Sequence, residues 1–91
     1  MNPISDAAGP VREVHAIPLW LLREYLEELG GEAHSDTVVV GDGWQVVLTK
    51  LPPKEVGSLR VGQVEVVFHG EPAAIQALQK RFYLKTMRAG A

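Results

Sequence analysis

Residues 37–51 read TVVVGDGWQVVLTKL, two runs rich in β-branched residues that are separated by Gly41-Asp42-Gly43. The Gly-Asp and Asp-Gly dipeptides can both supply the positive φ angles that a tight turn between antiparallel strands requires. The stretch therefore predicts a β-hairpin. Pro52-Pro53 follows it at once, and because proline cannot donate a hydrogen bond to a neighbouring strand, we expect the second strand to end there.

Two further segments on either side of this hairpin predict strands. Residues 11–17 form a first strand, in which Glu13 and His15 face away from Val14 and Ala16. Residues 58–68 predict a second hairpin that turns near Gly62-Gln63. Its last part alternates Val64, Val66 and Phe68 with Glu65, Val67 and His69, which is typical of a half-buried strand.

Two helices complete the expected order. Pro18 suits the first turn of a helix, and Gly30-Gly31 suits its end. Leucines recur between them at helical spacing, at Leu19, Leu22, Leu26 and Leu29. A second helix is expected after Pro72, with a stripe of Ile75, Leu78 and Phe82.

The resulting order is β-α-β-β-β-β-α, an α+β fold in which short hairpins make the last four strands antiparallel. Two amphipathic helices bury their apolar stripes most economically on one face of a single sheet, which leaves the other face open. We expect a flexible N-terminal tail at residues 1–10 and a single domain at residues 11–91. The expected inward side chains are Trp44, Val46, Leu48, Leu59, Val61, Val64, Val66 and Phe68.

Composition excludes several classes of function. The chain of 91 residues has no cysteine, so disulfides, thiolate metal sites and cysteine nucleophiles are absent, and its net charge of −2 does not favour nucleic acid. No apolar run approaches the ~20 residues that cross a bilayer, so we expect no membrane association. The first ten residues lack the features of a secretion signal, so a cytoplasmic location is expected.

Four segments together resemble a known family. They are LREYLEELGG at 22–31, LPP at 51–53, GSLRVGQVEVVFHGEP at 57–72 and RFYLKTMRAG at 81–90. The combination resembles the C-terminal domain of MoaD-related proteins, relatives of the small ubiquitin-like subunit of molybdopterin synthase that carry an extra domain. The resemblance implies a TATA-binding-protein-like β-α-β4-α fold.

The resemblance assigns no catalytic residue or cofactor to this domain. It implies an accessory role in molybdopterin or sulfur-carrier metabolism. We expect this chain to lack the ubiquitin-like module that precedes the domain in those relatives. Direct sulfur carriage is disfavoured, because the last residues are Ala89-Gly90-Ala91 rather than the Gly-Gly that thiocarboxylate formation uses. No acid, base and nucleophile converge in the sequence, so we expect a non-enzymatic domain without a cofactor.

His15, His34 and His69 raise the possibility of a metal site. None of them lies at the helical spacing of four residues, and a third ligand would have to come from Glu13 or Glu65. His15 and His69 could still meet if the first and last strands are neighbours. Surface or strand-end histidines are the simpler interpretation, and no metal is expected.

The expected interaction surface combines the open sheet face, an exposed tryptophan and the basic C-terminal segment. Its residues are Trp20, Val47, Arg60, Val67, His69, Lys80, Arg81, Lys85 and Arg88. We expect it to bind a protein partner or a second copy of the chain, and an exposed edge at Val38–Val40 would favour a twofold dimer. The alternative is a small-ligand site in a cavity between sheet and helices, with Tyr25 or Tyr83 as polar groups.

Overall fold

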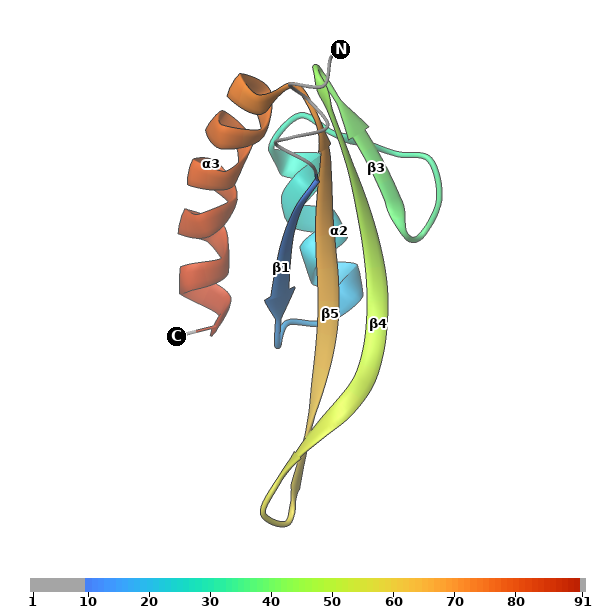
Figure 1. Ribbon diagram of the computed structural model, residues 1–91, viewed down its shortest axis with the longest axis vertical. Coiled ribbons are helices and arrows are strands. Elements are labelled where there is room, and N and C mark those ends of the chain that lie inside the picture. The colour runs from blue at the N-terminus through green and yellow to red at the C-terminus, as the bar shows by residue number, and fades with distance from the viewer. Residues whose placement is uncertain (1–9, 91) are drawn as a thin grey trace.

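A computed structural model describes residues 10–90 (Figure 1). The elements in chain order are β1 (Val11–His15), α2 (Leu19–Glu28), β2 (Glu32–Ala33), β3 (Val38–Gly41), β4 (Trp44–Val56), β5 (Leu59–Gly70) and α3 (Pro72–Gly90). The five strands form one antiparallel sheet in the order β1-β5-β4-β3-β2. The α+β fold is therefore confirmed. Neither helix of the described part of the chain is long and apolar enough to cross a membrane.

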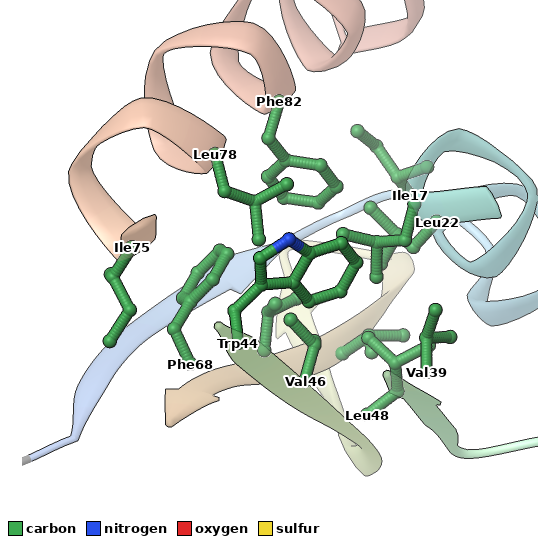
Figure 2. Close-up of a cluster of buried hydrophobic side chains, with 13 residues drawn as sticks. Ile17, Leu22, Val39, Trp44, Val46, Leu48, Phe68, Ile75, Leu78 and Phe82 are labelled. Carbon is green, nitrogen blue, oxygen red and sulfur yellow. The ribbon is translucent and has the colours of Figure 1, made fainter. Parts of the chain in front are cut away.

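Both helices bury their apolar stripes in the same hydrophobic core, on one face of the sheet. Figure 2 shows Leu78 and Phe82 of α3 and Leu22 of α2 gathered around Trp44 and Phe68 of the strands. Thirteen buried residues make up this core, and Phe68 and Phe82 are the largest of them that are fully buried. Their rings meet edge to face, with centroids 5.8 Å apart.

Trp44 is buried, as expected, because two glycines make room for its indole. A Cβ atom on Gly41 would lie 2.1 Å from the Trp44 ring, and one on Gly31 would lie 2.6 Å from it. Gly41 therefore serves close packing rather than turn geometry. Gly43 alone supplies the positive φ of the β3–β4 turn, at 83°.

The second expected hairpin was placed wrongly. Gly62 and Gln63 lie inside β5, and the chain turns instead at Gly57-Ser58, where Gly57 has a φ of 61°. A two-residue loop with positive φ at its first residue matches the type II′ hairpin turn. Pro52-Pro53 does not end β4, because a register shift between Leu51 and Lys54 accommodates the prolines within the strand.

The displaced turn creates a long two-stranded extension, which we call the β-arm, at residues 51–63. Here β4 and β5 pair only with each other, and Figure 1 shows the β-arm protruding beyond both helices. Leu59 was expected to point into the core but is 67% exposed at the tip of the β-arm, and Val61 is only half-buried. The molecule is accordingly elongated, with extents of 48 × 27 × 24 Å.

The short strand β2 was not expected, and it changes the edge of the sheet. Glu32 and Ala33 pair with Val40 and Val39, so the valine run of β3 is not an edge strand. Val39 is completely buried in the core. The dimer edge that we expected at these valines is therefore largely covered.

Candidate interaction surface

Helix α3 has two apolar faces, and only one of them is buried. Ile75, Leu78 and Phe82 enter the core. On the opposite side, three large apolar side chains lie in solvent: Tyr83 and Leu84 are each 61% exposed and Met87 is 49% exposed. Spacings of three and four residues place them together on one side of the helix.

Basic residues border this exposed apolar group. Lys80 and Arg88 lie one turn before and one turn after Leu84, and Arg81 is exposed beside them. We call this surface the α3 patch, with residues Lys80, Arg81, Tyr83, Leu84, Met87 and Arg88. The basic residues of the α3 patch were expected on an interaction surface, whereas its apolar residues were not. Their helical spacing was the signal that could have revealed them.

Lys85, also expected on the surface, is engaged within the fold. Its Nζ lies 2.6 Å from Glu28 Oε1 and 5.7 Å from the centre of the Tyr25 ring. These contacts join α3 to α2 and leave little of the ammonium group for a partner. Tyr25 is therefore occupied by a cation of the same chain.

Three of the four residues expected on the outer sheet face are neighbours, and the fourth lies apart from them. Val67 does face outward, but it is only 8% exposed, since it is flanked across the strands by Arg12 and Val47. Val47 is half-buried, and His69 is exposed near the end of β5, opposite Gln45. Arg60 lies far from Val47, Val67 and His69, in the β-arm, so it does not belong to the same surface.

Trp20 borders a groove at the start of α2, where it is 56% exposed. The groove has a volume of about 980 Å³ and runs from the first turn of α2 to the base of the β-arm. Its lining consists of Ala16, Ile17, Pro18, Leu19, Trp20, Arg23, Asp36, Thr37, Lys50, Leu51, Pro53, Gly62, Gln63 and Val64. This is not the site expected for a small ligand, because Tyr25 and Tyr83 lie outside it.

Glu13 and His15 point toward the helices and form a polar cluster against α3. Glu13 accepts hydrogen bonds from His15 Nε2 and Gln79 Nε2, each at 2.7 Å. The His15 ring also meets Phe82 edge to face, with centroids 5.5 Å apart. The hydrogen bond from His15, supported by that from Gln79, holds the pKa of the Glu13 carboxyl below its usual range, although burial opposes the shift.

The structure does not bring the three histidines together. His15 pairs with Val64 at one end of the β1–β5 ladder, whereas His69 lies beyond the other end, where Val11 pairs with Phe68. His34 follows β2, at the opposite edge of the sheet from β1, and lies 3.5 Å from Glu32. Within residues 10–90, no three potential ligands gather closely enough to hold a metal ion.

The Glu13 cluster should make stability depend on pH. The pKa of Glu13 is lower in the folded state than in the unfolded chain, so its contribution is fully present above the ordinary glutamate pKa. It is lost as pH falls through the lowered value. Glu13→Gln is therefore expected to cost about 1 kcal/mol of unfolding free energy at pH 7, with the difference from wild type shrinking toward pH 3.

Urea unfolding of both proteins between pH 7 and pH 3 measures this difference. Glu24→Gln, on the exposed face of α2, is the matched control and should stay within about 0.5 kcal/mol of wild type at every pH. A constant gap between Glu13→Gln and wild type across this range would show that the carboxylate charge is not what holds α3 to β1.

A family model described as "Archaeal MoaD-like protein" matches residues 11–91. The chain belongs to this family. The match spans both helices and all five strands, so the α3 patch, the groove and the β-arm all lie within this archaeal MoaD-like domain. The expected relation to MoaD-type proteins is confirmed, and no curated protein matches the chain.

Proposed function

We propose that this MoaD-like chain is a non-enzymatic accessory domain that binds an acidic partner protein through the α3 patch. That partner acts in molybdopterin or sulfur-carrier metabolism. The exposure of Tyr83, Leu84 and Met87 on one side of α3 is the observation that carries it. The family match supports the choice of pathway.

The composition of the α3 patch matches that of a protein-binding surface. Grouped large apolar side chains rimmed by polar ones mark contact sites, and tyrosine and arginine are enriched among residues that dominate binding energy. Among the described residues, the ion pairs do not include Lys80, Arg81 or Arg88. These cations are therefore available to steer an acidic partner toward the patch.

A non-enzymatic role agrees with how the polar groups are used. Glu13, His15 and Gln79 bond to one another and hold α3 against β1 rather than opening onto the groove. Helix α3 continues through the basic segment to Gly90, so Lys80, Arg81 and Arg88 are presented on a helix. Both features support binding rather than catalysis.

Calorimetric titration with two purified proteins of the same organism tests the proposal: the ubiquitin-like sulfur carrier and the large subunit of molybdopterin synthase. Wild type is expected to bind one of them with a dissociation constant in the micromolar range, more weakly as salt increases. Leu84→Asp with Met87→Asp should weaken binding about tenfold or more, because it places charge in the apolar centre of the patch.

Gln76→Asp is the matched control, since it adds one negative charge to an exposed position in the first half of the same helix. It should reduce binding less than threefold, roughly the effect of a rim charge. Failure of wild type to bind either protein would contradict the proposed pathway. Undiminished binding by the double variant would contradict the proposed surface.

A further inference from the structure

The β-arm is a part of the molecule that the proposed partner site does not use. Strand β1 pairs with β5 only at residues 64–68, and β3 pairs with β4 only at residues 44–47. Beyond these, the β-arm is a ribbon of two strands, and its residues 52–60 are all exposed. An isolated two-stranded ribbon is marginally stable in water, so the β-arm would gain stability from a surface to rest on.

The tip of the β-arm carries apolar side chains that nothing in the described chain covers. Val56 and Leu59 pair directly across the Gly57-Ser58 turn and are 53% and 67% exposed. On the other face of the ribbon, Glu55 lies opposite Arg60, and their exposed side chains approach only to 3.9 Å. The tip thus presents two apolar groups and a carboxylate that is weakly held.

The groove offers the complementary features. Leu19, Trp20, Leu51 and Val64 give it an apolar wall. Lys50 lies in the same lining, and among the described residues it has no acidic partner within 4.0 Å. The other cation of the groove is Arg23, which already contacts Asp36. Lys50 is therefore the natural counterpart of a carboxylate that enters the groove.

We infer that the β-arm of one chain seats in the groove of a second copy, to give a twofold symmetric dimer. Each chain carries both a β-arm tip and a groove, and its groove lies at the base of its own β-arm. A single twofold axis therefore generates two identical tip-to-groove contacts between the two chains. The tip enters the groove so that Val56 and Leu59, on one face of the β-arm, pack against Trp20 of the other copy, while Glu55, on the other face, lies against its Lys50. No residue of α3 lines the groove, so this contact does not depend on the α3 patch.

Pro52 and Pro53 limit how the two chains can meet. Prolines remove hydrogen-bond donors from β4 at the base of the β-arm, which disfavours the addition of another strand along the β4 edge. Contact through the side chains of the tip does not require such strand addition. Twofold symmetry then gives a closed dimer rather than an open fibre.

Analytical ultracentrifugation of the full chain between about 1 and 500 μM tests the dimer. Wild type is expected to sediment as a dimer at the upper concentrations, and Val56→Asp with Leu59→Asp should weaken association about tenfold or more. Val14→Asp, which changes an exposed valine on β1, should leave the dimer intact. Lys50→Glu and Glu55→Lys should each weaken the dimer, and the two together should restore it.

Because the chain has no cysteine, directed cross-linking can place the contact. Mixing Leu59→Cys with Trp20→Cys under mild oxidation should give a disulfide-linked heterodimer, while each variant alone should remain largely uncross-linked. A strictly monomeric wild type at 500 μM overturns the inference. So does a dimer that survives both tip substitutions, or cross-linking that is equally fast in each variant alone.

Discussion

Phe82→Ala is expected to remove about 3–5 kcal/mol of unfolding free energy, the range for deleting a large aromatic side chain from a packed core. The Phe82 side chain is 1% exposed and is the point where α3 meets the sheet. Its ring contacts Phe68 edge to face and also the His15 ring. Domains of this size have a total stability of roughly 5–15 kcal/mol, so this single change should bring the fold close to its limit.

Urea unfolding followed by circular dichroism measures the loss. Tyr83→Ala is the matched control, because it removes the neighbouring aromatic side chain on the same helix, where 61% of the residue lies in solvent. It should cost less than about 1 kcal/mol. Similar losses for the two variants would mean that α3 does not pack against the sheet through Phe82.

Gly70→Ala is expected to cost about 3 kcal/mol or more, for two independent reasons. Gly70 has a φ of 137°, a backbone conformation that strains residues with a Cβ atom. The added Cβ would also lie 2.2 Å from the carbonyl oxygen of Gly43 and 2.8 Å from Trp44 Cα. Both are backbone atoms, which cannot rotate away as a flexible side chain could.

Gly62→Ala and Gly57→Ala separate the two causes. A Cβ on Gly62 meets nothing within 4 Å and the residue needs no positive φ, so this variant should be neutral or slightly stabilising. Gly57 has open space but a positive φ of 61°, so it should show backbone strain alone, about 1 kcal/mol. Thermal unfolding should therefore rank Gly70→Ala lowest, then Gly57→Ala, then Gly62→Ala. A Gly70→Ala variant as stable as Gly57→Ala would contradict the close contact at Gly43.

Local patterns predicted the elements that depend on local chemistry. The leucine spacing and Gly30 placed α2, and Gly43 placed the turn before β4. The Gly57-Ser58 turn was missed, because glycine is compatible with both strands and turns, and the turn was expected near Gly62-Gln63. Pro52 and Pro53 predicted the end of a strand. In the structure β4 continues past them, because the register shift between Leu51 and Lys54 lies in a solvent-exposed two-stranded ribbon, where missing hydrogen-bond donors are tolerated.

Contacts between residues far apart in the sequence determine the orientation of some side chains, and local sequence patterns do not show these contacts. Glu13 and His15 turn toward α3 because Gln79 and Phe82, more than sixty residues away in the chain, supply a hydrogen bond and an aromatic edge. The basic half of the candidate site was visible as a charge cluster. Its apolar half was not, since periodicity alone does not show which stripe of a two-faced helix the sheet will cover.

Nuclear magnetic resonance mapping tests the central claim, that this domain acts by binding a partner through α3. The ¹⁵N-labelled chain is titrated with whichever unlabelled protein binds in calorimetry, and backbone amide shifts are followed residue by residue. We predict that the largest changes fall between Lys80 and Arg88, with the sheet and the β-arm little affected. Changes concentrated in the groove or on the outer sheet face, with α3 silent, would contradict the account.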